Sequence, residues 1–254
     1  MKIVRYRQEG RDRYGVLEED RVAPLDGTVE ALAPVAGAKP VALSAVRLLA
    51  PTVPSKIVAI GLNYADHAAE GNRELPKEPM LFIKPSTAVI GPGDEIVYPP
   101  QTANLHHEGE LAIVIGKTAR NVSLTDARRY VLGYTCANDV TARDLQRRDV
   151  QFTRGKGFDT FAPLGPWIVT DLEPSNLALE TRVNGEVRQK SRTAQLIFNC
   201  DYLVSFISQV MTLLPGDVIS TGTPAGVGPM KVGDVVEVEI EQIGCLKNTI
   251  AAPR

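Results

Sequence analysis

The sequence predicts a β-dominated α+β protein, and two observations lead to this fold class. Short apolar segments with strand-like alternation recur along the chain, separated by turns rich in glycine and proline. Only two segments have apolar residues at helical spacing, which is too few for a doubly wound sheet, where helices alternate with strands. The strands expected in the main part of the chain read LFIKPS, EIVYP, ELAIVIG, GYTCANDV, LGPWIVT, LETRVNG, VISTGTP and VVEVEIEQIG.

The N-terminal segment favours a small β-rich unit of its own. It reads KIVRYR, RYGVLEE and RVAPL, with polar turns between them. The stretch LLAPTVPSK, residues 48–56, carries two prolines and is typical of a connector. We therefore expect a small N-terminal β-rich domain over residues 1–52 and a larger catalytic domain over residues 53–254.

Two helices are expected in the larger part. In SLTDARRYVLGY, Ser123 and Asp126 have capping-box spacing, and Gly133 would end the helix. In CDYLVSFISQVMTLLPGD, apolar residues from Leu203 to Leu214 recur at helical spacing before Pro215. This stripe predicts a helix packed against the core.

Composition and charge exclude several classes of function. The chain has 28 Lys and Arg against 30 Asp and Glu, with a formal net charge of −2, so nothing favours binding to nucleic acid or to a membrane surface. No apolar run is long enough to span a bilayer, and charges interrupt the start MKIVRYRQEG where a signal peptide would be apolar. Three widely spaced cysteines fit reduced, structural thiols. We expect a cytoplasmic protein.

The stretch HHEGELAIVIG, residues 106–116, places two carboxylates at the head of an apolar strand. Because alternate side chains of a strand share a face, Glu108 and Glu110 point the same way, and Ala112 and Val114 continue that face. Two buried carboxylates need a cation or raised pKa values. The segment VVEVEIEQ has the same spacing of glutamates, but there one face is wholly charged and the other wholly apolar, which indicates a solvated strand. We interpret Glu108 and Glu110 as a buried ligand pair.

A hard cation such as Mg²⁺ needs a third oxygen ligand, ideally on a neighbouring buried strand. Asp139, in GYTCANDVTARD, follows a run of small and apolar residues and is a candidate. The spacing is equally compatible with an aspartate that caps a turn or pairs with Arg143.

His67 and Glu70, in GLNYADHAAEGN, are three residues apart, so in a helical turn they share a face. The carboxylate would orient the imidazole, and such a pair can make a water nucleophilic near neutral pH. A surface pair without function is the commoner origin of this spacing. The polar segment AAEGNRELPKEP that includes Glu70 carries Gly71 and Pro76 and suits a mobile loop that closes over a site.

Two further segments hold candidate residues. Lys156 lies between glycines in RGKGFDTFAP; such a lysine is usually solvated, but near a metal it would stabilise a developing enolate. TGTPAGVG, residues 221–228, lacks the Lys and the Ser or Thr that end a phosphate-binding P-loop. Its turn could instead bring backbone N–H groups and Thr223 to an anionic ligand.

Taken together, these segments resemble the fumarylacetoacetate hydrolase family. The stretches that carry the resemblance are GLNYADHAAE, LFIKPS, HHEGELAIVIGKTARNVS, GYTCANDVTARDLQ, GKGFDTFAPLGPWIV, VNGEVRQ and MTLLPGDVISTGTPAGVG. They run in the family's order from about residue 55 to 248, and it is their joint occurrence that is specific.

The resemblance implies a mixed β-roll or sandwich fold, a homodimer and a divalent ion, Mg²⁺ or Mn²⁺ with Ca²⁺ as an alternative. It implies the following site: metal ligands Glu108, Glu110 and Asp139; a catalytic His67 and Glu70 dyad on a lid; a catalytic Lys156; and substrate contacts from Arg143, Gln146 and Thr223. It leaves His106 and His107 as packing or supporting groups.

The resemblance also implies a metal-dependent enzyme that acts on 2-oxo or 2,4-dioxo carboxylates through a metal-bound enolate. The leading expectation is C–C bond hydrolysis of an acylpyruvate by water that His67 activates. Isomerisation of 2-hydroxyhepta-2,4-diene-1,7-dioate, decarboxylation of 5-oxopent-3-ene-1,2,5-tricarboxylate in aromatic catabolism, and decarboxylation of oxaloacetate use the same kind of enolate. Leu62 stands where acylpyruvases tend to have Arg, whereas Arg143 and Gln146 favour acylpyruvate or oxaloacetate-type substrates. A catalytically silent, metal-stabilised oligomer is the alternative outside the enzymes.

Overall fold

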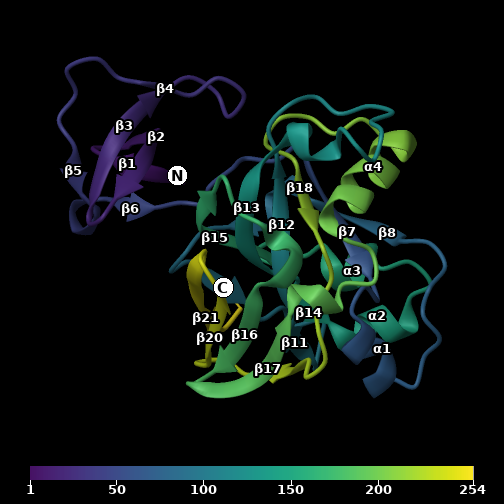
Figure 1. The fold of residues 1–254 in the computed structure, drawn as a ribbon. Coiled ribbons are helices and arrows are strands. Elements are labelled where there is room, and N and C mark those ends of the chain that lie inside the picture. The colour runs from purple at the N-terminus through teal and green to yellow at the C-terminus, as the bar shows by residue number, and fades with distance from the viewer. Residues whose placement is uncertain (254) are drawn as a thin grey trace.

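Strands dominate the computed structural model, which describes residues 1–253 (Figure 1). The strands are β1 Lys2–Gln8, β2 Arg11–Glu18, β3 Arg21–Asp26, β4 Ala33–Pro34, β5 Val41–Ala42, β6 Arg47–Leu48, β7 Lys56–Gly61, β8 Met80–Pro85, β9 Val89–Ile90, β10 Glu95–Val97, β11 Leu105–His107, β12 Gly109–Ile115, β13 Val131–Asn138, β14 Thr141–Ala142, β15 Ala162–Val169, β16 Ala178–Val183, β17 Glu186–Arg192, β18 Val218–Ser220, β19 Gly228–Met230, β20 Val235–Ile240 and β21 Gly244–Ala251. The helices are α1 Ala65–Glu70, α2 Arg143–Arg148, α3 Thr153–Lys156 and α4 Cys200–Val210, with short 3-10 turns at Leu43–Ala45, Ser86–Ala88, Ala127–Tyr130, Pro174–Asn176 and Thr193–Gln195. The predicted β-dominated α+β class is confirmed.

The strands form three sheets. The largest has the order β4-β3-β2-β1-β15-β13-β12-β18-β7-β8, with β5, β6 and β9 paired at its sides. A second sheet has the order β10-β21-β20-β16-β17, and a third, small one has the order β14-β11-β19. This small sheet and the start of β12 carry the segment that holds the two glutamates.

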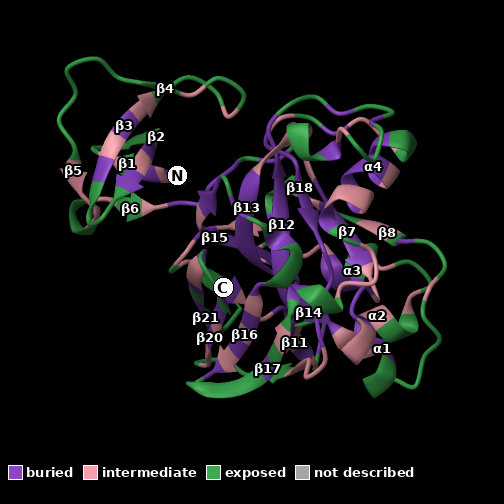
Figure 2. Ribbon diagram, viewed as in Figure 1, coloured by how far each residue is buried: buried purple, intermediate pink, exposed green. Residues whose placement is uncertain are grey.

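β12 is buried along its whole length, as Figure 2 shows. Leu111, Ile113 and Ile115 face a core that the second sheet and α4 complete. Ala112 and Val114 face a separate core on the other side. The prediction that both faces of this strand are buried is confirmed, because apolar layers cover both sides of the central sheet.

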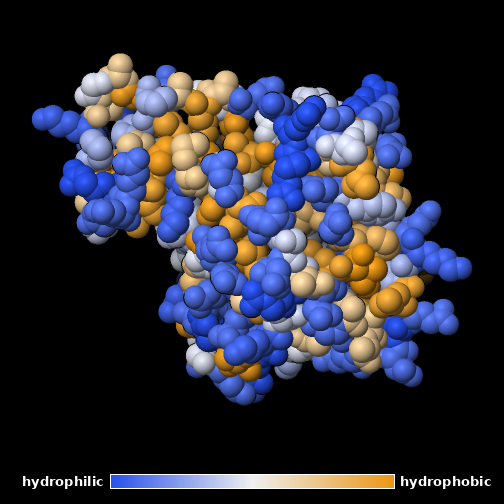
Figure 3. Space-filling model, in the orientation of Figure 1, coloured by the Kyte–Doolittle hydropathy of each residue, from blue (hydrophilic) through white to orange (hydrophobic). Residues whose placement is uncertain are grey.

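The N-terminal strands β1, β2 and β3 form an antiparallel meander. Pairing of β1 with β15, through Lys2 with Val169 and Ile3 with Ile168, makes it continuous with the central sheet. Figure 3 shows polar side chains spread over the visible face, with apolar atoms gathered where this unit meets the rest of the chain. The division into domains at residues 1–52 and 53–254 stays a prediction.

Of the two predicted helices, one is present. α4 begins after Asn199, whose side chain accepts a hydrogen bond from the Tyr202 N–H at 2.9 Å, and buries its apolar stripe against the core. It ends at Val210 rather than just before Pro215. Among residues 1–253, no helix is both long and apolar enough to cross a membrane.

The helix predicted over residues 123–133 is wrong. Ser123 and Asp126 do exchange hydrogen bonds, but they support only the 3-10 turn Ala127–Tyr130, and β13 begins at Val131. β13 pairs with both β12 and β15, so sheet formation overrides the local capping signal. At Gly133 the neighbouring backbone is so close that a Cβ atom would lie 2.4 Å from the Val169 carbonyl oxygen.

The strand used for comparison, β20, behaves as its alternation predicts. Val236, Val238 and Ile240 are buried, whereas Glu237 and Glu239 lie on the open face and pair with Arg182 of β16. These glutamates therefore belong to a surface ion-pair network.

Candidate active site

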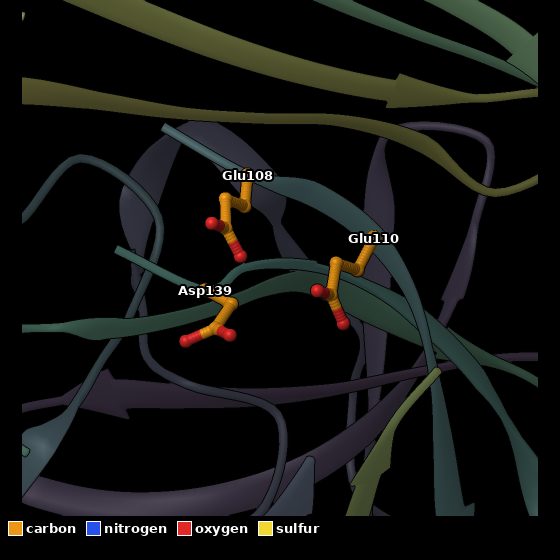
Figure 4. A group of neighbouring side chains, drawn as sticks. All are labelled: Glu108, Glu110 and Asp139. Carbon is orange, nitrogen blue, oxygen red and sulfur yellow. The ribbon is translucent and has the colours of Figure 1, made fainter. Parts of the chain in front are cut away.

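Three buried carboxylates converge at the end of the central sheet (Figure 4). Glu108 lies between β11 and β12, Glu110 lies in β12, and Asp139 follows β13. The Asp139 N–H donates to the Glu108 carbonyl at 2.8 Å, which fixes the two segments side by side. One oxygen of each carboxylate lies within 4.8 Å of the others. The alternative in which Asp139 pairs with Arg143 is wrong, since Arg143 contacts Glu108 instead.

The residue between the two glutamates must be small. A Cβ atom at Gly109 would lie 2.0 Å from Thr181 Oγ1 of β16, because the second sheet packs directly over this point of β12. Because side chains alternate along a strand, Glu108 and Glu110 face one side and position 109 faces the other, toward Thr181.

Glu110 is in an environment that disfavours its charge. Burial, together with the charges of Asp139 and Glu108, raises the pKa of Glu110 to about 8, although Ser220 opposes the shift. Its carboxyl accepts hydrogen bonds from Ser220 Oγ at 2.5 Å and from the Gly222 N–H at 2.8 Å. In the absence of a bound metal ion, this carboxyl therefore holds a proton at neutral pH.

Two buried lysines neutralise the other two carboxylates. Lys156 Nζ donates to Glu108 at 2.7 Å and to Asp139 at 2.6 Å, and Lys84 Nζ donates to Asp139 and to the Val140 carbonyl. The view of Lys156 as a solvated lysine is wrong.

The pKa values of these groups follow from burial and from their partners. Burial alone would lower the pKa of Lys156, but the charges of Asp139 and Glu108 outweigh it and raise that pKa. For Lys84, burial dominates, and its pKa is lowered. Burial would raise the pKa of Glu108, but Lys156 and Arg143 hold it well below its usual range.

This donor set fits a hard divalent cation. All three converging groups supply oxygen, the ligand type that Mg²⁺, Mn²⁺ and Ca²⁺ prefer. Burial and two neighbouring carboxylates disfavour the charge of Glu110, and a bound cation would relieve this electrostatic situation. Glu108, Glu110 and Asp139 are the residues that would hold it.

The predicted dyad lies on α1. His67 Nδ1 is 3.1 Å from Glu70 Oε2, and the other oxygen of Glu70 accepts from the Gly226 N–H at 3.1 Å. Asp66 directly precedes His67 in α1. Its carboxylate accepts a hydrogen bond from Ser191 Oγ and another from the Ala225 N–H at 3.4 Å. α1 is thus held against β17 and the loop 221–228.

A cavity of about 490 Å³ connects these groups, and all nine predicted site residues line it. They are His67, Glu70, Glu108, Glu110, Asp139, Arg143, Gln146, Lys156 and Thr223. Apolar side chains from β8 and from the segment before α3, including Met80, Phe82 and Phe152, line much of the rest. The strands and helices therefore bring together residues from six separate stretches of sequence.

The three predicted substrate contacts have protein partners in this structure. Arg143 donates to Gln146 Oε1 at 2.5 Å as well as to Glu108. The Thr223 hydroxyl donates to the Gly109 carbonyl at 2.9 Å and accepts from Gln189 Nε2 at 2.7 Å. Thr223 thus ties its loop to the strand that carries Glu110.

Sequence reasoning missed two buried residues of this region. Lys84 lies in LFIKPS, and its only sequence signal is a charge within an apolar strand. Gln189 lies in the polar strand β17, yet its side chain is buried and bridges the Gly109 N–H to Thr223 and to the Pro224 carbonyl.

The two adjacent histidines do not join the carboxylate group. His107 Nδ1 is 3.3 Å from Gln189 Oε1, and His106 Nε2 is 2.9 Å from Asn104 Oδ1. Burial lowers the pKa of each to about 4, so both are neutral at neutral pH. Their place beside the site agrees with packing or supporting roles.

Comparison with known families covers nearly the whole chain. Residues 56–251 match the model of the fumarylacetoacetate hydrolase C-terminal domain. Residues 1–51 match the model of an N-terminal domain named Rv2993c-like.

Three relatives illustrate the range of named activities. A crystal structure of 5-carboxymethyl-2-hydroxymuconate delta-isomerase from Mycobacterium smegmatis is 46% identical, with a TM-score of 0.93 over 100% of both chains. The mitochondrial oxaloacetate tautomerase FAHD2A of Bos taurus is 47% identical over 82% of this chain and 70% of its own. A maleylpyruvate hydrolase from Sphingobium sp. SYK-6, in complex with manganese(II) and pyruvate, is 31% identical, with a TM-score of 0.82 over 100% of both chains. The chain belongs to the fumarylacetoacetate hydrolase family.

Proposed function

We propose that this protein is a divalent-metal-dependent enzyme that moves a proton at C3 of a 2-oxo carboxylate, as a tautomerase or isomerase. The observation that carries the proposal is the buried group of Glu108, Glu110 and Asp139 at one end of the cavity that His67 also lines. Relatives named for tautomerase and isomerase activity are 42 to 47% identical, whereas the solved structures named as hydrolases are 39% and 31% identical. For this reason we propose isomerisation first, rather than the hydrolysis expected from the sequence.

The bound ion, Mg²⁺ or Mn²⁺, would supply positive charge to the carboxylate and 2-oxo oxygens of the substrate and so acidify C3. The complex of the maleylpyruvate hydrolase with manganese(II) and pyruvate supports this choice of ion and ligand.

The residues of this chain would handle the proton. Glu70 lies at Nδ1 of His67 and can accept its N–H, which leaves Nε2 as the basic nitrogen. His67 Nε2 would take the proton from one position of the substrate and return it to another. Lys156 pairs with Glu108 and Asp139, Lys84 pairs with Asp139, and Met80, Phe82 and Phe152 offer apolar surface to the carbon chain.

C–C bond hydrolysis of an acylpyruvate is the second candidate. The His67 and Glu70 dyad favours it, because the same nitrogen could activate a water. Leu62, which lines the cavity where acylpyruvases tend to have Arg, weighs against it.

One experiment separates these candidates. The protein is incubated with enol-form oxaloacetate, with 2-hydroxyhepta-2,4-diene-1,7-dioate and with acetylpyruvate, in Mg²⁺, in Mn²⁺ and in EDTA. Metal-dependent loss of enol absorbance without carbon–carbon cleavage supports the tautomerase or isomerase, and release of acetate and pyruvate supports the hydrolase. A catalytically silent oligomer would turn over no substrate, lose thermal stability on chelation and fail to bind oxalate.

We also propose that the chain forms a homodimer, as its family resemblance implies. Analytical ultracentrifugation of the whole chain tests this, and a monomer at micromolar concentration would contradict it.

A further inference from the structure

Gln189 is a buried amide in an otherwise exposed strand. β17 lies at the edge of the second sheet, and Figure 2 shows most of it as exposed, whereas Gln189 is 1% exposed. A buried amide costs free energy unless its donors and its acceptor are paired. Here Oε1 accepts from the Gly109 N–H at 2.9 Å, and Nε2 donates to Thr223 Oγ1 at 2.7 Å and to the Pro224 carbonyl at 2.9 Å. Gln189 therefore joins β12 to the loop 221–228.

An irregularity of β17 turns this side chain inward. In the pairing with β16, Gln189 lies opposite Thr181, and Arg188 is an extra residue before the next pair. Such a bulge breaks the alternation of a strand and re-aims the side chains beside it. The loop packs directly against the bulge, because a Cβ atom at Gly226 would lie 2.1 Å from the Arg188 carbonyl oxygen, and the φ of +93° at Gly226 favours glycine.

The far part of the loop holds α1. The Ala225 N–H donates to Asp66 at 3.4 Å, and the Gly226 N–H donates to Glu70 at 3.1 Å. α1 has six residues and no side-chain hydrogen bond at its N-cap, and a helix this short is not stable by itself. The position of His67 therefore depends on contacts that come from outside the helix.

The near part of the loop is fixed to the strand that carries the carboxylates. The Gly222 N–H donates to Glu110 at 2.8 Å, and Thr221 donates to the β12 backbone through both its N–H and its hydroxyl. Residues 223 and 224 lie between this fixed part and the part that holds α1, and both accept from the Gln189 amide. The amide thus supports the connection between the carboxylate group and α1.

We infer that Gln189 is a positioning residue that holds the helix of His67 in place relative to the metal ligands, through the loop 221–228. Gln189 does not line the cavity, so it acts through its neighbours rather than on a ligand. The consequence for catalysis rests on the proposed function, in which His67 moves a proton of the substrate.

Hydrogen exchange of the whole chain without metal tests the connection. Gln189→Met keeps most of the buried volume and removes the hydrogen bonds of the amide. Exchange at residues 221–226 and at residues 65–70 should become about tenfold faster, as for the loss of two hydrogen bonds. Gln189→Glu is a milder second variant. It keeps the acceptor for the Gly109 N–H and can replace at most one of the two donated bonds, so exchange at both segments should still rise.

Asn248→Leu is the matched control. Asn248, in β21, is similarly buried, donates to the Gly91 and Asp94 carbonyls at 2.9 Å each, and does not line the cavity. Its loss should lower the free energy of unfolding in urea about as much as Gln189→Met does, but leave exchange at residues 65–70 unchanged.

Turnover by the same three variants separates positioning from general stability. With enol-form oxaloacetate and saturating Mg²⁺, kcat of both Gln189 variants should fall at least about tenfold, because a small displacement of a catalytic group is costly. Asn248→Leu should retain the kcat of the wild type.

Three results would overturn the inference while the proposed function stands. They are unchanged exchange at residues 65–70 in both Gln189 variants, the same acceleration there in Asn248→Leu, and faster exchange with unchanged kcat. If the wild type converts neither oxaloacetate nor 2-hydroxyhepta-2,4-diene-1,7-dioate in Mg²⁺, the proposed function itself fails, and the exchange data still decide whether Gln189 holds α1.

Discussion

Lys156 and Glu108 form a buried ion pair, with Nζ and Oε2 2.7 Å apart. The same ammonium lies 2.6 Å from Asp139, so one lysine bridges two of the three carboxylates that would bind a cation. It lowers the pKa of Glu108 against the effect of burial and forms an ion pair with Asp139, at the cost of burying its own charge.

The variant Lys156→Met should therefore destabilise the metal-free protein. Loss of the ammonium leaves Glu108 and Asp139 with less compensation in a buried site, and removal of one partner of a buried pair typically costs about 3 to 5 kcal/mol. Urea unfolding in EDTA measures this cost. Unfolding in saturating Mg²⁺ should restore part of the loss, and a change under about 1 kcal/mol in EDTA would contradict the role given to Lys156.

Binding of Mg²⁺ should release a proton from Glu110. Because the pKa of Glu110 is raised to about 8, its carboxyl is protonated at pH 7 and must ionise to become a ligand. Affinity for Mg²⁺ should therefore rise with pH and level off above pH about 8. Calorimetry at pH 7 in buffers of different ionisation enthalpy counts the protons released, with Glu110→Gln as the control that releases none.

The same shift predicts how stability depends on pH without metal. The folded-state pKa of Glu110 lies above its ordinary value of 4.5, so between these two pH values the folded protein holds a proton that the unfolded chain has lost. This contribution is fully present below pH about 4.5 and disappears as the pH rises through about 8. Unfolding in EDTA across this window should show it in the wild type but not in Glu110→Gln.

His67→Ala should separate catalysis from metal binding. We expect turnover to fall by about 10² to 10⁴, as for loss of a general base, with little change in the affinity for Mg²⁺. Glu108→Ala should lower both the turnover and the affinity for Mg²⁺. Equal loss of metal affinity in the two variants, measured by titration with Mn²⁺, would exclude these roles.

Asp66→Ala should loosen α1. Its carboxylate accepts from Ser191 Oγ and from the Ala225 N–H, so its loss frees the helix that carries His67 from β17 and the neighbouring loop. We expect faster hydrogen exchange at residues 65–70 and a lower kcat, with global stability changed by less than about 1.5 kcal/mol. Ser191→Ala should reproduce the effect on exchange; unchanged exchange in both variants would rule out the anchor.

Strand patterns explain how much of the fold could be predicted. Alternation located β12 and β20 and distinguished a buried strand from a solvated one, because the side-chain period of a strand is visible in a single sequence. For residues 123–133 the sequence pattern predicted a helix, which is wrong. Val131 and its neighbours are extended because they pair with β12 on one side and β15 on the other, and this pairing is not visible in the local sequence.

The residues of the site also divide into those that could be predicted from the sequence and those that could not. Glu108 and Glu110 could be found because their spacing conflicts with the apolar strand that follows, and the family resemblance supplied Asp139, His67 and Lys156. Gln189 could not be found, since EVRQKSR has the composition of an exposed strand and its burial depends on a loop far along the chain.

Gly109 makes the ligand geometry inseparable from the spacing between two sheets. Any side chain at this position would meet Thr181 Oγ1 of β16, so in Gly109→Ala either the Thr181 side chain must rotate away or the second sheet must move away from β12. Attempts to re-engineer this site for another ion must therefore take account of the packed side chains of Thr181, Val238 and Gln189 as well as of the ligands themselves.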